Sequence, residues 1–249
     1  MQQDTNRDTG ALPEIRRVRH ELKLRDLEVA RIDALGPGFA AITFRGEALA
    51  DFVTLSFDDH VKLFFDGVDG GEGARRDYTP RRHDREAREL SIEFALHGDG
   101  IAANWARGAR VGQRLTVGGP RGSMIVPMEC AWHLLVGDAT ALPAIARRLE
   151  ELPRDVRVFV LGLAPREERR DFVTAARAEV QWFDAAQPLL DALQALPLPP
   201  GHGFAWGGGE AAAMAQVRRL LADKGLPRQL TRVSAYWKEG VADHHENLE

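Results

Sequence analysis

The chain has 249 residues, enough for one large domain or two of ordinary size with a substantial core. Its 33 Lys and Arg nearly balance 37 Asp and Glu, so the charge favours no nucleic-acid partner, and no apolar run of about 18 residues offers a membrane span. The polar N-terminus lacks the apolar core of a signal peptide, so we expect a cytoplasmic protein without a membrane partner. The single Cys130 excludes an internal disulfide and a thiolate-held iron–sulfur cluster.

The first half of the chain alternates short apolar strands with turns. Between Glu21 and Asp33 the apolar residues are spaced as in a strand, and a slip in phase between Leu24 and Leu27 suggests a bulge. Further strands are expected at 39–44, 61–65, 90–96 and 114–117, and a short helix at 101–107. Short strands divided by Gly and Pro turns at this density predict a closed antiparallel barrel.

The second half changes its period to strands that alternate with helices. Strands are expected at 132–136, 156–162, 203–207 and 233–237, with helices ending near 152, spanning about 166–178 and ending near 221. This alternation predicts a parallel sheet covered on both faces. We therefore predict an antiparallel β-barrel domain over 15–127 and a parallel-sheet α/β domain over 128–249, with the boundary near Pro127.

The segment 75–81 concentrates residues suited to a ligand that carries both phosphate and a ring. Arg76 offers a planar fork that matches phosphate oxygens, and Tyr78 can lie against a π-system. In an extended segment these two side chains share one face and Thr79 takes the other, and Pro80 stops a helix from running through them. We interpret the segment as a flavin nucleotide site, and the alternative is a charged hairpin with a buried Tyr.

Several further motifs follow one another along the chain. In order they are His60-Val61-Lys62-Leu63, Arg76-Asp77-Tyr78-Thr79-Pro80-Arg81, Leu96-His97-Gly98, Trp105-Ala106, Gly119-Pro120-Arg121-Gly122-Ser123, Asp138-Ala139-Thr140-Ala141-Leu142-Pro143-Ala144-Ile145, Gly209-Glu210 and Tyr236-Trp237-Lys238-Glu239-Gly240. Together with the two-part architecture, they resemble the ferredoxin reductase-like flavoproteins. More narrowly, they resemble the siderophore-interacting protein family, which are flavin-dependent ferric-siderophore reductases.

The resemblance implies that FAD binds to the barrel. Arg76 would pair with the FAD phosphates, Tyr78 would pack against the isoalloxazine, and Thr79 would donate a hydrogen bond near the reactive edge of the ring. The loop before the predicted short helix would offer backbone N–H groups to the pyrophosphate. The other cofactor-binding positions implied for the barrel are Asp77, His97, Gly98, Gly100, Ala102, Ala103, Trp105, Gly119 and Ser123.

Two positions of the barrel motifs carry an alternative or a departure. His97 is either a cofactor-binding residue or a structural histidine that holds a turn. Ala103 stands where related proteins usually carry Ser, so a hydroxyl contact is lost there while amide contacts remain.

In the second half, the turn from Gly137 to Pro143 follows a strand, where a parallel sheet binds its nucleotide. The family commonly has Glu where this chain has Ala139, and the alternative interpretation of the turn is an ordinary capped helix. The implied nucleotide-binding residues are Asp138, Thr140, Ala141, Arg166, Gly209, Glu210 and Trp237.

The strand end near Arg166 also bears on the choice between NADPH and NADH. The arginines there, Arg166, Arg169 and Arg170, favour the 2′-phosphate of NADPH, although Arg169 and Arg170 are equally typical of a solvated helix face.

The substrate implied by the resemblance is a ferric siderophore, whose anionic or oxygen-rich surface suits a cationic cleft. Lys62, Arg121 and Lys238 would lie around the flavin edge, each with a plain surface charge as its alternative. Electrons would pass from NADPH, or NADH, through FAD to ferric iron, and we expect neither a catalytic side chain nor a protein metal site. We expect a monomer. The alternatives are the same fold fed by a ferredoxin, and a non-catalytic siderophore-binding protein.

Overall fold

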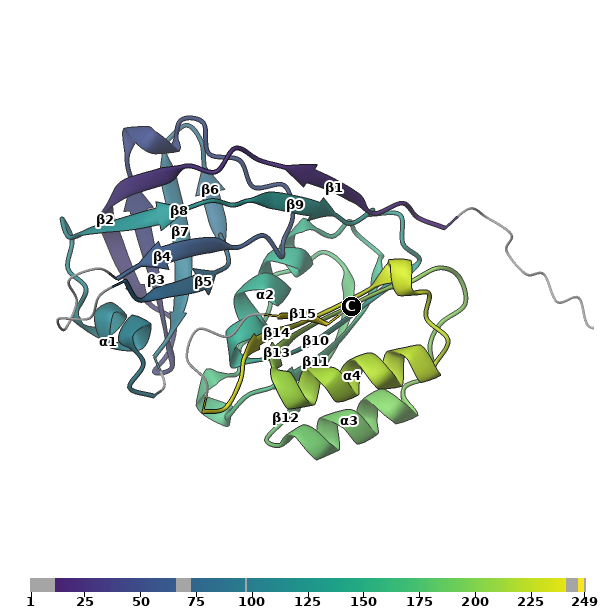
Figure 1. The fold of residues 1–249 in the computed structure, drawn as a ribbon. Coiled ribbons are helices and arrows are strands. Elements are labelled where there is room, and N and C mark those ends of the chain that lie inside the picture. The colour runs from purple at the N-terminus through teal and green to yellow at the C-terminus, as the bar shows by residue number, and fades with distance from the viewer. Residues whose placement is uncertain (1–11, 66–72, 97, 241–245, 249) are drawn as a thin grey trace, which may run out of the picture.

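The computed structural model describes residues 12–65, 73–96, 98–240 and 246–248. Two main sheets follow one another along the chain, an antiparallel, barrel-like sheet in the first half and a mostly parallel sheet with helices in the second (Figure 1). The predicted fold class is therefore confirmed.

The barrel is a seven-stranded sheet in which every pair of neighbours is antiparallel. Its core is formed by fully buried aliphatic and aromatic side chains such as Ile42, Phe44 and Ile92. In sheet order the strands are β5 (Arg75–Tyr78), β4 (Val61–Phe64), β8 (Arg114–Gly118), β2 (Leu24–Ala34), β3 (Phe39–Arg45), β7 (Glu89–Ala95) and β6 (Arg82–Asp84). A 3-10 turn, η1 (Glu47–Leu49), follows β3.

Helix α1 (Ile101–Gly108) lies at one end of the barrel (Figure 1). Trp105 on this helix is 4% exposed, and its ring packs with Phe44, Phe65 and Phe94 at centroid distances of 6.1, 5.8 and 5.6 Å. The helix is therefore fixed to the barrel by an aromatic cluster.

The irregularity of β2 lies at a different place from the one the sequence suggested. The strand pairs with β8 without interruption from Leu24 to Glu28, and its bulge falls between Val29 and Arg31 opposite β3. Leu24 is 65% exposed while Leu27 is fully buried, so the slip in phase reflects a surface leucine. The predicted bulge between Leu24 and Leu27 was wrong.

A two-stranded ribbon extends from the barrel over the second half of the chain (Figure 1). It pairs β1 (Arg16–Arg19) with β9 (Gly122–Ile125) in antiparallel register. A Cβ at Gly122 would lie 2.5 Å from the carbonyl oxygen of Val18, so the close approach of the two strands requires glycine at that position. Neither strand was predicted.

The second half forms a six-stranded sheet whose first five strands run parallel, with the last antiparallel at the edge. In sheet order the strands are β12 (Arg177–Phe183), β11 (Arg157–Leu163), β10 (Trp132–Asp138), β13 (Phe204–Glu210), β14 (Thr231–Trp237) and β15 (Glu246–Leu248). The central strands β10 and β13 are buried along nearly their whole length, as expected for a sheet covered on both faces.

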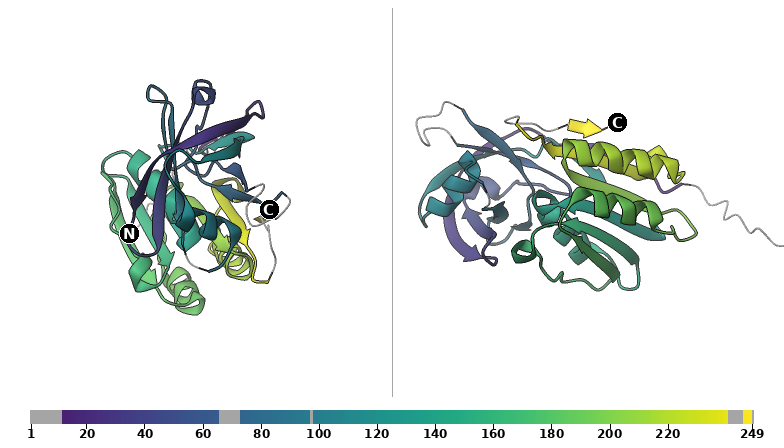
Figure 2. Two further views of the ribbon diagram at one scale, coloured as in Figure 1. Left: turned by 90° about the vertical axis from the view of Figure 1, so that its left-hand side faces the viewer. Right: turned by 90° about the horizontal axis from the view of Figure 1, so that it is seen from below.

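Three helices and three 3-10 turns complete the second half. Helices α3 and α4 lie side by side on one face of the sheet, and α2 lies on the other face, toward the barrel (Figures 1 and 2). Their bounds are α2 (Leu142–Glu151), α3 (Ala186–Ala195) and α4 (Ala211–Asp223), with η3 (Ala139–Ala141), η4 (Arg166–Glu168) and η5 (Arg228–Leu230). Among the described residues, no helix is long and apolar enough to cross a membrane.

One predicted helix, over about 166–178, is absent from this region. Only the single turn η4 forms, and the edge strand β12 begins at Arg177. Arg169 pairs with Asp184, and Arg170 pairs with Glu93 of the barrel at 2.5 Å. These tertiary contacts hold the segment in an irregular path in spite of its helix-forming composition.

The two halves share a buried cluster of side chains. Phe57 of the first half is fully buried and packs edge-to-face on Trp206 of β13, with ring centroids 5.5 Å apart. Phe39 of β3 joins the same cluster, together with Leu135 of β10 and Ile145 of α2. Shared apolar packing therefore fixes the barrel against the α/β sheet.

Candidate functional site

Strand β5 carries three of the predicted site residues at the edge of the barrel sheet. It pairs with β4, which places Tyr78 opposite Val61 and Asp77 opposite Lys62. The Tyr78 ring packs on Phe94 at a centroid distance of 4.6 Å. Burial raises the pKa of the Tyr78 phenol, and the positive charge of Arg76 offsets only part of that rise. The phenol is therefore neutral at physiological pH.

Thr79 follows the strand and is only 7% exposed. Within the described part of the chain its hydroxyl makes no hydrogen bond, so it is available to a ligand. Arg76 and Tyr78 are on the same side of β5 because they are two residues apart, and both are half-buried. A guanidinium, a ring and a hydroxyl thus lie at this strand end.

The loop before α1 contains two glycines whose side-chain positions face open space. Gly98 has a φ of 71°, which glycine adopts without strain, and Gly100 is the N-cap of the helix. A Cβ added to either glycine would meet nothing within 4 Å. The first-turn amides of α1 have no partner within the helix, so this end of α1 is suited to an anion. His97 lies outside the described residues.

Other predicted residues of α1 act through packing or backbone. The side chains of Ala102 and Ala103 are 7% and 6% exposed, and Trp105 belongs to the barrel core. Sequence reasoning missed Arg107, whose guanidinium donates to the carbonyl oxygens of Leu96, at 2.6 Å, and Gly98. Arg107 therefore braces the loop from the side of the helix, a contact between positions 9 and 11 residues apart that no local motif indicates.

Gly119 and Ser123 are engaged elsewhere. The Gly119 carbonyl accepts a hydrogen bond of 3.1 Å from Arg25. The Ser123 hydroxyl is 2% exposed, donates to Asp59 at 2.6 Å and lies 2.8 Å from Nε2 of His20. The Ser123 hydroxyl is thus held by Asp59 and His20.

In the second half, Asp138 at the end of β10 is hydrogen-bonded to three other predicted residues, Thr140, Glu210 and Trp237. Its Oδ1 accepts from the backbone N–H and hydroxyl of Thr140, at 2.9 and 2.5 Å. Its Oδ2 accepts from the backbone N–H of Glu210 at 2.9 Å and from the indole of Trp237 at 2.7 Å. Burial raises the pKa of Asp138, and these four hydrogen bonds oppose the rise.

Gly209 completes this arrangement because its backbone passes close to Asp138. Its φ is 153°, and a Cβ there would lie 2.6 Å from Asp138 Oδ2. The Glu210 carboxylate caps α4 by accepting from the backbone N–H groups of Ala212 and Ala213. Ala141 is fully buried, with its methyl group against Gly137, so it contributes packing.

A small hollow opens beside Asp138 at the carboxyl ends of the parallel strands. It is lined by Gly137 and Asp138 of β10, Leu163 of β11, Glu210 of β13 and Met214 of α4. The chain turns from β10 to β11 on one side of the sheet and reaches β13 on the other. The hollow thus lies at the point where strand order reverses, which is where open α/β sheets bind nucleotides.

The three arginines near the end of β11 have different surroundings. Arg169 pairs with Asp184 and also donates to the carbonyl oxygen of Ala164 at 3.0 Å. Arg170 pairs with Glu93. Arg166 is exposed and, within the described residues, pairs with no acidic side chain. Of the three, Arg166 is the one left for an external phosphate.

The ends of β5 and β14 are within electrostatic reach of one another. Burial raises the pKa of Tyr236 on β14, with smaller contributions from the negative charges of Asp58, Asp138 and Asp77. Asp77 belongs to β5 of the barrel and Asp138 to the carboxyl end of β10, so charges from both sheets lie near this phenol.

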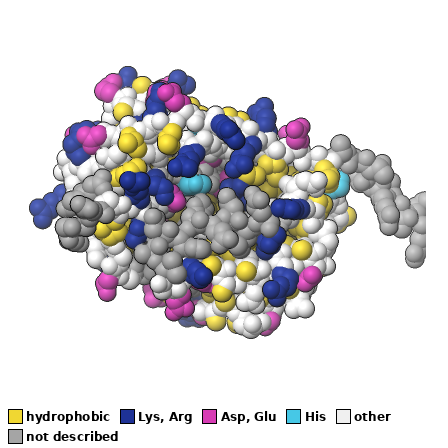
Figure 3. Space-filling view, viewed as in Figure 1, with side chains coloured by type: hydrophobic (Ala, Val, Ile, Leu, Met, Phe, Trp, Pro, Cys, Tyr) yellow, Lys and Arg dark blue, Asp and Glu magenta, His cyan; other side chains and the backbone are white. Residues whose placement is uncertain are grey.

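The predicted substrate-binding cations occupy three different elements. Lys62 on β4 pairs with Asp77 at 3.1 Å, and Arg121 and Lys238 are exposed, the latter next to Trp237. Figure 3 shows Lys and Arg side chains around the middle of this face of the molecule and acidic side chains mainly toward its margin. Over the described ranges, no three His, Cys, Asp or Glu side chains form a group that could hold a metal ion.

Comparison with protein families gives a match in each half. The family described as siderophore-interacting FAD-binding domain matches residues 28–72 and 68–124. The family described as siderophore-interacting protein matches residues 130–240. The two matches together cover most of the chain.

Curated proteins and solved structures match over nearly the full length. The NADPH-dependent ferric-chelate reductase of Escherichia coli is 35% identical, over 89% of this chain and 95% of that protein. The ferric vibriobactin reductase of Vibrio cholerae is 28% identical, over 89% and 93%. The crystal structure of a siderophore utilization protein from T. fusca is 36% identical with a TM-score of 0.87, over 93% of this chain and 98% of that one.

Proposed function

The chain belongs to the siderophore-interacting protein family, and from that premise we propose that it is a flavin-dependent reductase of ferric siderophores that uses NADPH. One observation carries the proposal. The strand end that bears Arg76, Tyr78 and Thr79 lies at the edge of the barrel sheet. Helix α2, which starts directly after the turn held by Asp138, binds the next two residues, Pro80 and Arg81, through its side chains. A hydride donor and a flavin would meet between these two ends.

The donor set at the barrel fits FAD. Arg76 suits a phosphate, the amides after Gly98 suit a pyrophosphate, and Tyr78 and Thr79 suit a polar ring. FAD held there would supply the redox chemistry, which is acceptance of a hydride from NADPH and transfer of its two electrons singly to two ferric ions, with NADP⁺ and a proton as the other products. The chain provides the orientation and the electrostatics, and Ala103 provides only its amide.

At the other end, the turn at Asp138 and the carboxyl ends of the parallel strands are suited to the nicotinamide nucleotide. Asp138 fixes the turn at Thr140 and the backbone at Glu210, so the walls of the hollow are held before a ligand arrives. Arg166 lies three residues beyond Leu163, which lines the hollow. Its unpaired guanidinium is suited to the 2′-phosphate of NADPH.

The substrate would approach the cationic face of the molecule. Lys62, Arg121 and Lys238 supply positive charge on three elements, which raises the local concentration of an anionic ferric complex. Hard oxygen ligands hold ferrous iron far less tightly than ferric iron, so reduction releases the metal. Because NADPH is a cytoplasmic donor, we place the reaction in the cytoplasm.

An anaerobic absorbance titration of the FAD-reconstituted protein tests this function. We expect oxidised-flavin bands that bleach with NADPH and return with a ferric siderophore. A flavin that ignores NADPH but, after chemical reduction, is reoxidised by the ferric complex would instead indicate a ferredoxin as donor. Failure to bind FAD would contradict the proposal and leave the siderophore-binding protein as the better explanation.

A further inference from the structure

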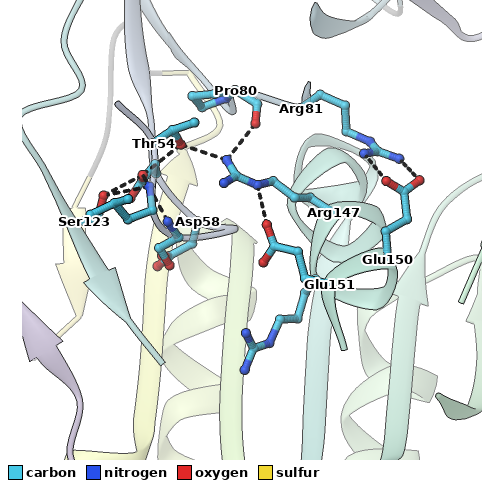
Figure 4. A network of polar contacts seen from close by, with 12 residues as sticks. Thr54, Asp58, Pro80, Arg81, Ser123, Arg147, Glu150 and Glu151 are labelled. Atoms are coloured by element: carbon cyan, nitrogen blue, oxygen red, sulfur yellow. Dashed lines mark hydrogen bonds and ion pairs between the residues drawn. The ribbon is translucent and has the colours of Figure 1, made fainter. Parts of the chain in front are cut away.

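The residues that follow Thr79 are held by helix α2 of the other half. Arg147 of α2 donates from one nitrogen, Nη1, to the carbonyl oxygen of Pro80 at 2.8 Å and to the hydroxyl of Thr54 at 2.9 Å. Figure 4 shows its guanidinium extended from the helix between these two acceptors. Pro80 and Thr54 precede Arg147 by 67 and 93 positions in the chain.

Arg147 is itself fixed. Its side chain is 11% exposed, and its Nε donates to Glu151 Oε1 at 2.8 Å, one turn further along α2. Thr54 is also held, because its hydroxyl donates to Asp59 at 2.8 Å. The guanidinium therefore reaches Pro80 from a fixed position on the helix.

The next residue is anchored to the same helix. Arg81 is 8% exposed and binds Glu150 through both terminal nitrogens, at 2.9 and 2.5 Å (Figure 4). Its Nε also lies 2.9 Å from Glu93 of β7. Two consecutive residues, Pro80 and Arg81, are thus attached to α2 by charged groups, and α2 starts directly after the turn that Asp138 holds.

We propose that Arg147 is a positioning residue for the flavin site, which fixes the backbone after Thr79 on helix α2 before FAD binds. The inference rests on the proposed function, which places the flavin beside Tyr78 and Thr79. A carbonyl that accepts from a buried guanidinium moves little, so Thr79 is already in place when the cofactor arrives. Such preorganisation strengthens binding by reducing the ordering that binding requires.

The test uses the full-length apoprotein and the variants Arg147→Met and Arg147→Lys. The matched control is Arg157→Met, which removes an exposed arginine paired with Glu179 at 3.0 Å at the far side of the sheet. In apo Arg147→Met we expect faster amide hydrogen exchange over residues 79–82. From flavin fluorescence we expect a dissociation constant for FAD that is roughly tenfold larger than that of the wild type. We expect Arg147→Lys to recover part of the affinity and the control to change neither.

The outcomes separate this inference from the proposed function. An unchanged FAD dissociation constant in Arg147→Met, with only a lower melting temperature, would overturn the positioning role. If wild-type protein failed to bind FAD, the proposed function would fail, while exchange in the apoprotein would still report whether Arg147 fixes residues 79–82. Should Arg147→Met not fold, Glu151→Met keeps the guanidinium and removes its anchor. We expect this variant to lose less FAD affinity than Arg147→Met would. An FAD affinity equal to that of the wild type would count against the proposal.

Discussion

At the nucleotide end, Asp138 receives all four of its hydrogen bonds from residues of the second half, whereas at the flavin end Pro80 and Arg81 are held by side chains from the other half of the chain. The first end is completed by backbone N–H groups and side chains at adjacent strand ends. The second depends on ion pairs that cross between the two sheets. A change to α2 should therefore reach the flavin end, and a change beside Asp138 should not.

The largest expected effect breaks the crossing contact itself. Replacing Arg81 with Met leaves Glu93, 7% exposed, with Arg170 as its remaining charged partner and leaves Glu150 without its bidentate one. Removing one partner of a buried ion pair costs about 3–5 kcal/mol. In a protein of this size that lowers the melting temperature by roughly 10 °C, which thermal unfolding of the apoprotein will measure.

Arg177→Met is the control for this prediction. Arg177 and its partner Asp155 are 72% and 61% exposed and both lie in the second half. Losing such an exposed pair costs less than about 1 kcal/mol. Equal losses in the two variants would show that the crossing ion pairs add no more stability than surface ones.

The sequence predicted most elements of the fold because their patterns are local. Alternating apolar residues indicated β7, and short apolar runs indicated β3, β10 and β13. Strand β12 was missed because it lies at the sheet edge, where Val180 is 38% exposed and no apolar run marks it. The segment before it has a helical composition, and its contacts with Glu93 and Asp184 override that composition.

The same distinction applies to the candidate site. Asp138, Thr140, Gly209, Glu210 and Trp237 were predicted from motifs at strand ends, and the structure brings all five together. Their roles in binding a nucleotide remain proposals.

The residues that the sequence did not indicate contact partners far away in the chain, or lie at helix positions that no motif marks. Arg147 and Glu150 lie on an amphipathic helix, where charged residues usually face solvent. Arg107 lies near the end of α1, and only the structure shows that its side chain turns back to the loop. A motif indicated Ser123 as a cofactor-binding position, and only the structure shows the bond of its hydroxyl to Asp59.

The second prediction tests whether the nucleotide end is independent of the flavin end. In Gly209→Ala the new Cβ would meet Asp138 Oδ2 at 2.6 Å at a backbone angle that suits glycine. Displacing Asp138 loosens Glu210 and Trp237, so we expect NADP⁺ to bind more weakly by about 2 kcal/mol, or roughly thirtyfold, in calorimetry. FAD affinity should not change.

Gly112→Ala separates steric contact from backbone strain. Gly112 also has a positive φ, 87°, but a Cβ there would meet nothing within 4 Å. It should lose stability through strain alone and keep its NADP⁺ affinity. A fall in FAD affinity in Gly209→Ala would show that the two ends are coupled through Asp138.

A smaller effect is expected at Arg166, where the prediction tests which arginine near the nucleotide end contacts the cofactor. Arg166→Met should lower the ratio of kcat/KM for NADPH to that for NADH about tenfold, or about 1.4 kcal/mol, because the 2′-phosphate loses its cation. Arg169→Met is the comparison, since Arg169 already pairs with Asp184. If steady-state kinetics gave an equal fall in both variants, Arg166 would not be the specific contact.

The smallest effect concerns the opposite end of the strand that carries Asp138. His133 on β10 is fully buried, and in the described structure neither ring nitrogen has a hydrogen-bond partner. Burial, and to a lesser degree the charge of Arg148, lowers the pKa of His133 to about 3. Arg148 stacks on Phe57 of the first half, 5.1 Å from its ring centroid, so the cation that acts on His133 lies at the joint between the two halves.

The sign of the pH dependence follows from that shift. The unfolded chain binds a proton at His133 near its ordinary pKa of about 6.5, whereas the folded chain does not until the pH approaches about 3. Stability is therefore complete above about pH 6.5 and is lost as the pH falls, by about 0.8 kcal/mol at pH 6.0. The free energy of unfolding in urea should differ between pH 7.5 and pH 6.0, and in His133→Leu this difference should be smaller than in the wild type by that amount. An unaltered difference would mean that His133 already has a partner in solution, and that the joint between the halves is more polar than its packing indicates.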